Sequence, residues 1–345
     1  MLLEELAYEL PDGLIAAYPV DDRSSARLMV VDRDADRVSH SDFASLGQFL
    51  AAGDLLVLNN SRVIPARLRG RKESGGRATV LLVEPFGDDE RCWIALVDGS
   101  KKPRLSSRIE FAKGISAIVV GDLGLGRFGL EFDCQQPVSE VIHSLGETPL
   151  PSYISRTRAA VEADRELYQT VYSKSPGSVA APTAGLHFTE SLLTELRGQG
   201  IDTAFVTLHV GPGTFRPVRD SVVERHRMEG EWYTLDSLAA SKIQRAKNAG
   251  HKVVCVGSTS TRTVEGIAQR KGRIEEDTGI TTIFITEGYS FRVVDSLITN
   301  FHLPRSTPLA MVAAMTGMDL LRRAYAEAIE QRYRFYSYGD AMLVL

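Results

Sequence analysis

The sequence predicts a mixed α/β protein in which a small antiparallel β-barrel is inserted into a larger α/β domain. Residues 59–133 form a succession of short apolar runs separated by turn-like breaks, with no convincing helix between them. After Pro137, candidate helices alternate with candidate strands, a pattern typical of α/β layering. The first sixty residues contain strand-like runs at 27–31 and 54–58, too few to make a domain by themselves. We therefore expect them to complete the larger domain.

The length of 345 residues favours two domains. We expect residues 1–60 and 150–345 to form one discontinuous α/β domain and residues 61–149 to form the inserted barrel domain. Barrel strands are expected at 79–83, 92–97, 108–111, 116–120 and 127–132. Closing such short strands into a barrel hides the sheet edges that would otherwise be exposed.

An arginine-rich segment, residues 61–72, precedes these strands. Arg67, Arg69 and Arg71 alternate along it, so a strand here would present three guanidinium groups on one face. A second arginine cluster lies at 322–334, close to several aromatic residues. Each cluster is either a solvated face or a contact for phosphates or stacked bases.

The C-terminal half supplies the elements of the larger domain. Helices are expected at 138–145, 164–172, 189–198, 236–249, 259–270 and 318–331. Strands are expected near 202–208, 252–257 and 281–285. This alternation is the basis for placing a layered α/β sheet here.

Composition excludes several classes of protein. The net charge of −4 excludes a broadly basic nucleic-acid coat, so a polyanionic partner would need a local basic patch. Cys92, Cys134 and Cys255 are isolated, which argues against a disulfide framework and a structural zinc site. The N-terminus is acidic, and no apolar run approaches the roughly 20 residues of a membrane span. We therefore expect a cytoplasmic protein without membrane association.

Common nucleotide and hydrolase motifs are missing from the sequence. Residues 124–129 match G-x-G-x-x-G, but 128–132 continue as a strand where the dinucleotide fingerprint needs a helix to begin. This segment is predicted to be a hairpin turn. The P-loop, G-x-S-x-G and H-E-x-x-H patterns do not occur, which excludes the common NTPase, hydrolase and zinc-protease interpretations.

The most informative feature is a pair of glycine-flanked histidine segments, 181–189 around His187 and 208–215 around His209. Small residues beside an imidazole let the backbone approach a ligand while keeping a titratable group within reach. His226 and His302 also lie in unusual local strings, and the histidines show no metal-ligand spacing. Each of the four could instead be a hydrogen-bonded structural histidine.

A hydroxyl-rich turn follows the strand-like run near 252–257 and opens a helix. The unpaired N–H groups at such a helix start can hold a carboxylate or a phosphate. A simple N-cap is the alternative interpretation.

Six strings, in order along almost the whole chain, resemble the S-adenosylmethionine:tRNA ribosyltransferase-isomerase family. They are residues 58–67, 168–172, 179–189, 206–215, 299–307 and 333–342. The resemblance implies a mixed α/β catalytic domain with an inserted β-barrel. It further implies an enzyme that transfers and isomerises the ribosyl part of S-adenosylmethionine onto 7-aminomethyl-7-deazaguanine at the wobble position of tRNA. The implied products are epoxyqueuosine-tRNA, adenine and methionine, in queuosine biosynthesis.

In that chemistry a base removes a proton from the ribose carbon beside the sulfonium, for which His187 or His209 is the candidate. The expected catalytic residues are His187, His209, His226, His302 and Tyr338. The expected S-adenosylmethionine-binding residues are Thr183, Gly185, Gly211, Gly213, Thr214, Ser258, Thr259, Arg262 and Asn300. The expected RNA-binding residues are Asn60, Arg62, Arg67, Phe188, Phe215, Tyr289 and Arg305. S-adenosylmethionine serves as ribosyl donor without a metal, and the partner is a tRNA with a GUN-type anticodon, bound by a monomer.

The chain departs from the family pattern at two positions where histidine is usual, Glu147 and Glu229. A carboxylate cannot donate as imidazole does, and it adds negative charge near an RNA site. Two alternatives therefore stand beside the leading interpretation. One is a divergent relative with another acceptor, and the other is a non-catalytic RNA- or nucleotide-binding relative. The intact segments 181–189 and 208–215 argue against the second.

Overall fold

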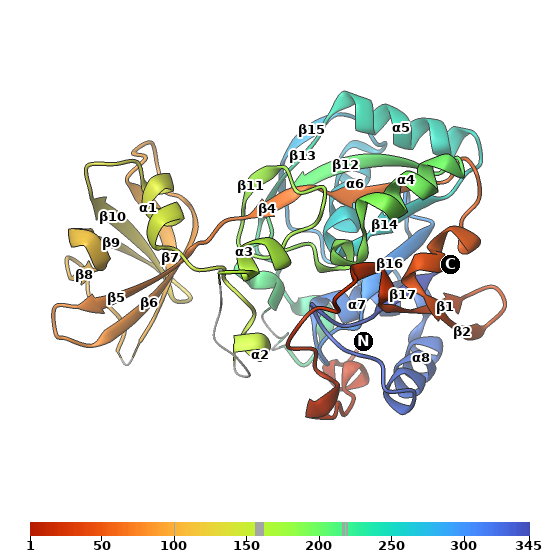
Figure 1. Cartoon of the computed structure of the whole chain (residues 1–345), viewed down its shortest axis with the longest axis horizontal. Helices are drawn as coiled ribbons and strands as arrows, with labels where there is room; N and C mark the ends of the chain where they lie inside the picture. Colours follow the sequence, from red (N-terminus) through yellow and green to blue (C-terminus); the bar gives the residue numbers. More distant parts are fainter. Residues whose placement is uncertain (100, 156–161, 216–217, 219) are drawn as a thin grey trace. The chain divides into compact units, whose positions relative to one another are not determined.

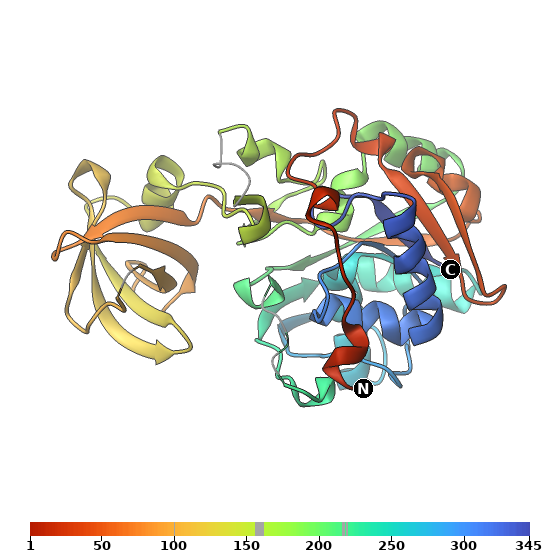
Figure 2. The ribbon, with the colours of Figure 1, turned by 90° about the horizontal axis from the view of Figure 1, so that it is seen from below.

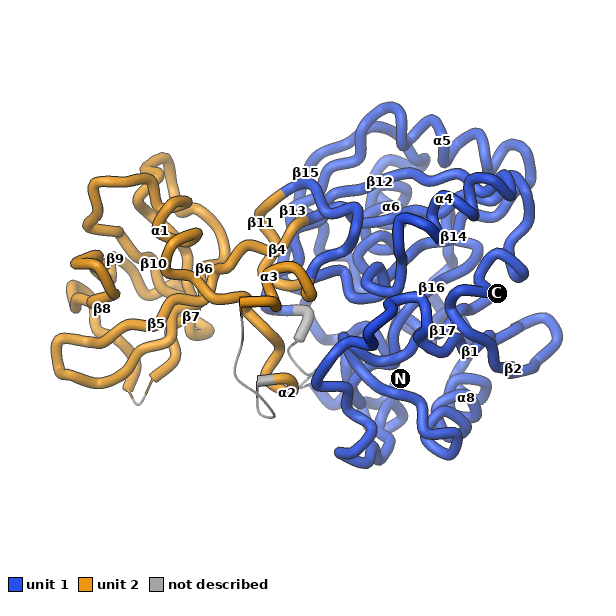
Figure 3. The backbone as a smooth tube through the Cα atoms, in the orientation of Figure 1, with its two compact units in different colours: residues 1–61, 169–175, 181–345 blue, residues 62–168, 176–180 orange. Residues whose placement is uncertain are grey.

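The computed structural model describes residues 1–345 with the exception of residues 100, 156–161, 216–217 and 219 and of the side chains of 155, 214 and 215. The chain divides into two compact units (Figure 3). The sheet unit comprises residues 1–61, 169–175 and 181–345, and the barrel unit comprises residues 62–168 and 176–180. The sequence placed the second boundary at 149/150, whereas residues 150–168 and 176–180 make their contacts within the barrel unit. That each unit is an independent domain stays a prediction.

Nine of the described strands form the sheet of the sheet unit, in the order β15-β13-β12-β3-β14-β16-β17-β1-β2 (Figure 1). Their bounds are β1 Arg27–Asp32, β2 Arg37–Asp42, β3 Leu55–Asn59, β12 Asp202–Leu208, β13 Glu231–Leu235, β14 Val253–Val256, β15 Asp277–Thr281, β16 Ser296–Asn300 and β17 Ala341–Val344. Neighbouring pairs among β12, β3, β14 and β16 are parallel. Strands β3 and β14 read as apolar runs because both of their faces are buried.

Helices cover the sheet, and their bounds are α4 Glu190–Gly198, α5 Ser237–Asn248, α6 Gly257–Lys271, α7 Thr307–Thr316 and α8 Met318–Glu330. Leu192, Leu193 and Leu196 of α4 pack in one core cluster with Leu56 and Leu58 of β3. Helices α5 and α6 contact β3, β12 and β14. Figure 2 shows the N-terminal segment beside α8, where residues 5–9 line an apolar cavity with this helix.

The barrel unit contains a closed barrel with the strand order β10-β7-β6-β5-β8-β9. The bounds are β5 Arg67–Lys72, β6 Arg77–Pro85, β7 Cys92–Asp98, β8 Arg108–Glu110, β9 Ser116–Gly124 and β10 Arg127–Asp133, followed by α1 Val138–Leu145. Further short elements are α2 Ser152–Ser155 and α3 Asp164–Leu167, and β4 Ser61–Val63 pairs with β11 Ser175–Ser178. Alternate residues such as Leu68, Val80 and Leu130 fill the interior, as the period of a strand requires.

The fold class predicted from the sequence is confirmed. A hairpin turn is also present within the predicted segment 124–129, since β9 ends at Gly124 and β10 begins at Arg127. The prediction of a strand near 281–285 is wrong. Strand β15 ends at Thr281, and residues 282–285 form no strand. Ile283 and Ile285 are instead buried beside Met311. The helix expected at 164–172 ends at Leu167, and α7 was not anticipated.

Candidate functional site

The carboxyl ends of β12, β3, β14 and β16 lie at one edge of the sheet because these strands are parallel. Open α/β sheets bind ligands at this edge. The segments that leave it carry His209 after β12, Asn60 after β3, Ser258 after β14 and His302 after β16. Strand β17 runs antiparallel to β16, so the loop before it, which contains Tyr338, reaches the same edge. Residues from five separate stretches of sequence thus meet at one candidate site.

Asn59, the last residue of β3, joins three of these segments. Its fully buried amide donates to Leu208 O at 3.0 Å and to Thr259 Oγ1 at 3.2 Å. The side-chain oxygen Oδ1 of Asn59 accepts from Leu208 N at 3.1 Å and from Ser61 N at 3.0 Å. The prediction from sequence omitted Asn59, although an asparagine that ends an apolar strand was a usable signal.

Helix α6 begins directly after β14 without a side-chain N-cap. Val256 occupies the cap position, and its side chain cannot accept a hydrogen bond, so the simple N-cap interpretation does not hold. The chain enters the helix through Gly257, whose φ of +83° is a conformation that favours glycine. Ser258 is partly exposed and Thr259 is buried. The first-turn N–H groups of α6 therefore face the sheet edge without side-chain partners from the cap.

His187 and Asn300 are in direct contact. The 3₁₀ segment Thr183–His187 brings the His187 Nε2 atom to 3.1 Å from Asn300 Nδ2, which also donates to Tyr336 O at 3.1 Å. Nε2 therefore accepts, and the imidazole is neutral with its proton on Nδ1. Burial lowers the pKa of His187 to about 3, and the charges of Arg334 and Arg23 add to this effect.

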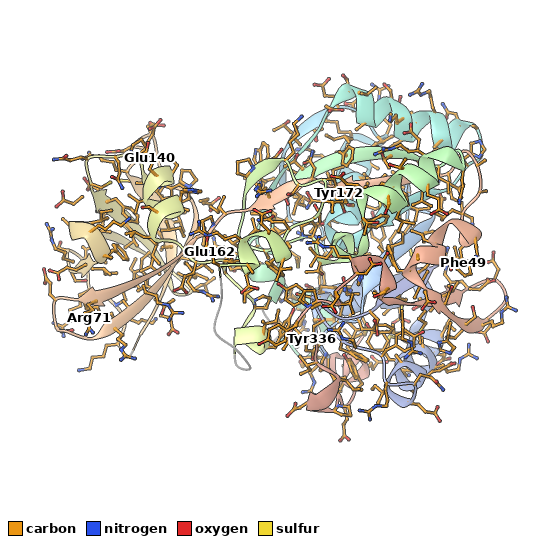
Figure 4. The ribbon with its side chains drawn as sticks, viewed as in Figure 1. Phe49, Arg71, Glu140, Glu162, Tyr172 and Tyr336 are labelled. Atoms are coloured by element: carbon orange, nitrogen blue, oxygen red, sulfur yellow. The ribbon has the colours of Figure 1, made fainter. Side chains whose placement is uncertain are left out.

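Asn300 retains one unused hydrogen-bonding atom. Both amide hydrogens are engaged by His187 and Tyr336, while Oδ1 is buried and has no partner among the described residues. Tyr336, labelled in Figure 4, holds its backbone in the left-handed region at φ 73°. A strained residue that presents its carbonyl to a site side chain is typical of functional loops.

His209 presents a different imidazole environment. Its ring stacks on Trp232 with centroids 5.0 Å apart, and its backbone N donates to Trp232 O at 2.9 Å. The Nδ1 atom is buried and has no hydrogen-bond partner within the described chain. Burial lowers the pKa of this imidazole. His209 is therefore held at its backbone and ring face while one ring nitrogen stays available to a ligand.

A buried ion pair joins α6 to β13, and a hydrogen bond links it to the loop after β12. Arg262 and Glu231 are each only 4% exposed, and Arg262 Nη1 donates to Glu231 Oε2. Glu231 Oε1 accepts from Gly211 N at 2.9 Å, and Arg262 Nε donates to Ile283 O at 3.2 Å. Arg262 Nη2 is buried and finds no acceptor in the part of the chain that is described. A guanidinium with one unsatisfied donor is suited to an anionic ligand. The site prediction from sequence omitted Glu231, because its partner Arg262 lies 31 residues further along the chain.

Both backbone groups of His302, its N–H and its carbonyl, are hydrogen-bonded to tyrosine hydroxyls. Its N–H donates to the Tyr325 hydroxyl at 3.0 Å, and its carbonyl accepts from the Tyr8 hydroxyl. Its Nε2 atom lies 2.6 Å from Thr299 Oγ1, and burial lowers its pKa to about 4.

His226 packs against Phe284. Burial lowers the pKa of this imidazole, although the negative charges of Asp220 and Glu229 act to raise it. No hydrogen bond or ring contact joins His226 to His187, His209 or His302 in the described residues. The structure therefore places His226 outside the contacts that connect the other site groups.

Residues 3–344 match the model of a family described as queuosine biosynthesis protein. The chain belongs to this family. A similar curated protein from Clostridioides difficile (strain 630), named S-adenosylmethionine:tRNA ribosyltransferase-isomerase, is 46% identical over 346 residues, with both chains covered completely. A protein of the same name from Geobacter metallireducens is 47% identical over 344 residues, again with full coverage. The crystal structure of S-adenosylmethionine tRNA ribosyltransferase from Thermotoga maritima shares 36% identity with a TM-score of 0.57, covering 99% of this chain and 100% of that one.

Two glycines of the strings shared with the queuosine family lie directly against side chains of the protein itself. A Cβ on Gly185 would overlap the Tyr172 hydroxyl, and one on Gly213 would lie 2.9 Å from the Glu229 carboxylate. The close approach that the sequence indicated at these two positions is thus made by protein side chains (Figure 4 labels Tyr172). Gly211 has only ordinary contact with Glu231, and Thr183 is partly exposed. The side chains of Thr214 and Phe215 lie outside the described residues.

One expected RNA-binding residue needs correction for this family member. Phe188 is fully buried in the main core, with its ring 5.0 Å from that of Phe43 and 6.4 Å from that of Tyr172. Such a ring has no face to offer to a base. Tyr289 is partly buried and donates to Glu265 at 2.9 Å, while Arg305 is exposed and pairs with an acidic side chain near the N-terminus.

The remaining RNA-binding candidates also have partners within the protein. Asn60 Oδ1 accepts from Thr207 Oγ1 at 2.6 Å in the sheet unit. In the barrel unit, Arg62 forms an ion pair with Glu166 at 3.1 Å. Arg67 donates to Leu150 O at 2.7 Å, and burial lowers its pKa. The site assignments for these family residues stay predictions.

Among the described residues, no group of three or more histidine, cysteine, aspartate or glutamate side chains is arranged to hold a metal ion. In the same part of the chain, every helix is too short or too polar to cross a membrane.

Proposed function

We propose that this chain transfers and isomerises the ribosyl part of S-adenosylmethionine onto 7-aminomethyl-7-deazaguanine at the tRNA wobble position. The observation that carries the proposal is full-length similarity to proteins named for this activity, and the buried atoms of His209, Arg262 and Asn300 that lack partners among the described residues support it. The products are epoxyqueuosine-tRNA, adenine and methionine. We further propose a GUN-type anticodon, a monomeric enzyme and a cytoplasmic location, all of which rest on the family resemblance.

The unsatisfied atoms of the site fit the groups of S-adenosylmethionine. Arg262 Nη2 is a charged donor without an acceptor among the described residues, and it suits the methionyl carboxylate. Asn300 Oδ1 is an acceptor without a donor in the same described set, and it suits the exocyclic amine of adenine. An amide oxygen cannot protonate a departing base, so Asn300 orients adenine while Tyr338 or His302 supplies the donor.

His209 is better suited than His187 to act as the general base. The carbon of the ribose beside the sulfonium carries acidified protons, and the base must reach them with an unengaged lone pair. His187 Nε2 already accepts from Asn300, and its pKa of about 3 makes it a weak base. His209 Nδ1 has no partner within the described residues. We therefore assign proton removal to His209 and orientation of Asn300 to His187.

The deciding experiment measures adenine and methionine release from S-adenosylmethionine with tRNA that carries the deazaguanine precursor. Release that depends on this tRNA is the expected result. A folded protein that releases neither product from verified substrates would contradict the proposal. Release without tRNA would instead identify a relative with another acceptor.

A further inference from the structure

The barrel carries an arginine face that the proposed chemistry does not use. Strand β5 points Leu68 into the core of the barrel, so Arg67, Arg69 and Arg71 point outward. This confirms the sequence prediction of three guanidinium groups on one strand face. Figure 4 shows Arg71 on the outer side of the barrel.

The strand register places a second arginine directly beside this row. Arg71 of β5 is paired with Arg77 of β6, and both are exposed. Like charges directly opposite on neighbouring strands destabilise a sheet. Within the described residues, neither side chain has a carboxylate within 4.0 Å, although Glu110 is the β8 residue paired with Arg71. The fold thus keeps a like-charged pair without an ion-pair partner among the described residues, and Arg71 Nη1 donates to Gly75 O at 3.5 Å.

These arginines line a cavity of about 480 Å³ on the barrel surface, together with Thr79, Glu110 and Phe111. Gly70 also lines this cavity, and its missing side chain lets β8 approach β5 closely, because a Cβ there would lie 2.8 Å from Glu110 O. Arg69, Arg71 and Arg77 line the cavity with Glu110, and Glu147 pairs with Arg69, so three guanidinium groups face two carboxylates and the site stays positive. The open cavity therefore suits an anion that arrives from solvent.

Arg69 already holds an anion of the protein itself. Its Nε and Nη2 atoms donate to the two carboxylate oxygens of Glu147 at 2.7 Å and 2.8 Å. This is the bidentate geometry that a phosphate also accepts. Glu147 is held there by its backbone, which exchanges hydrogen bonds of 2.9 Å and 3.2 Å with Arg67. The Glu147 carboxylate therefore occupies the position that a phosphate would take on Arg69.

We propose that this face binds the phosphate backbone of RNA through Arg71 and Arg77, and that Glu147 competes with phosphate for Arg69. Identification of the RNA as tRNA rests on the proposed function. Arginine favours phosphate because its fork binds two oxygens at once. Residues two positions apart on a strand are separated by about 7 Å, so Arg69 and Arg71 can meet different phosphates.

The test measures binding of a tRNA transcript with a GUN anticodon to the full chain, without S-adenosylmethionine, over a range of salt concentrations. Arg71→Ala/Arg77→Ala should weaken binding roughly 10- to 30-fold near 0.15 M salt and lower the salt slope by about two. Glu147→Gln should act in the opposite direction, because it frees Arg69 for a further contact. Arg91→Ala is the control, since Arg91 is paired with Asp89 on the same barrel.

The outcomes separate this inference from the proposed function. Arg71→Lys/Arg77→Lys should bind more weakly than the wild type but more tightly than Arg71→Ala/Arg77→Ala and should keep the wild-type salt slope, which shows that charge and not barrel folding is measured. Unchanged affinity and slope in Arg71→Ala/Arg77→Ala, or a wild type that does not bind the transcript, would overturn the inference even if the enzyme releases adenine. Binding that depends on Arg71 and Arg77 supports it even if adenine release fails.

Discussion

Glu231→Gln is the substitution whose effect follows most directly from the structure. The Glu231 carboxylate serves Arg262 with one oxygen and Gly211 N with the other. Glutamine has one acceptor and one donor in their place, so one of these two donors loses its acceptor in either orientation of the amide. The charge of Arg262 then stays 4% exposed without a counter-charge.

The expected loss is about 3 kcal/mol in the free energy of unfolding. Removing one partner of a buried ion pair costs about 3–5 kcal/mol, and the lower end applies because glutamine keeps one hydrogen bond. Such a loss reduces the ratio of folded to unfolded protein by about 10²-fold. Arg262→Met should have a cost of similar size. Glu231→Leu/Arg262→Met should cost less than either single change, since apolar groups of similar volume replace a buried pair at little cost.

Denaturant unfolding followed by tryptophan fluorescence measures these values. The chain has two tryptophans, Trp93 in the barrel unit and Trp232 in the sheet unit. In a Trp93→Phe background the signal comes from Trp232, the strand neighbour of Glu231. Single variants that each stay within about 0.5 kcal/mol of this background would refute the reasoning, because surface substitutions have effects of that size.

His209→Ala should lower the rate of adenine release by about 10²- to 10⁴-fold with unchanged S-adenosylmethionine binding, and a rate within threefold of wild type would remove His209 as the base. Acid should destabilise the protein, because the unfolded chain binds protons at about pH 6.5 that folded His187 and His302 bind only near 3 and 4. The free energy of unfolding should fall by up to about 1.4 kcal/mol per pH unit for each histidine as pH drops from 6.5 to 4. Denaturation midpoints at pH 7, 6 and 5 test this, and an equal slope in His302→Gln would contradict the contribution of His302. Gly257→Ala should destabilise by about 1–2 kcal/mol because its φ is +83°, and an unchanged melting temperature would argue against strain there.

Local pattern was sufficient to predict the barrel strands and most of the helices, but β2, β13, β15, β16 and β17 of the large sheet were not predicted. Periodicity and turn residues located the strands from 77 to 133 and the helix at 138–145 because each signal lies within the element itself. Helix α7 was not predicted because its residues are apolar on all sides, so the sequence shows no amphipathic period there. The prediction of a strand near 281–285 was wrong because the apolar side chains of Ile283 and Ile285 pack against Met311 of α7, outside any strand.

The sequence by itself determined the family, the fold class and the segments that carry His187, His209, Arg262 and Asn300, since these depend on composition and on contiguous strings. Only the tertiary structure decided which atoms of those residues are engaged. Asn59 reaches Thr259 across 200 residues, and Glu231 reaches Arg262 from another strand. Hydrogen bonding is decided within about 3 Å, and chain topology, not local pattern, brings such distant groups together. For this reason the sequence could not distinguish His187 from His209, whereas the structure gives His187 Nε2 a partner and His209 Nδ1 none among the described residues.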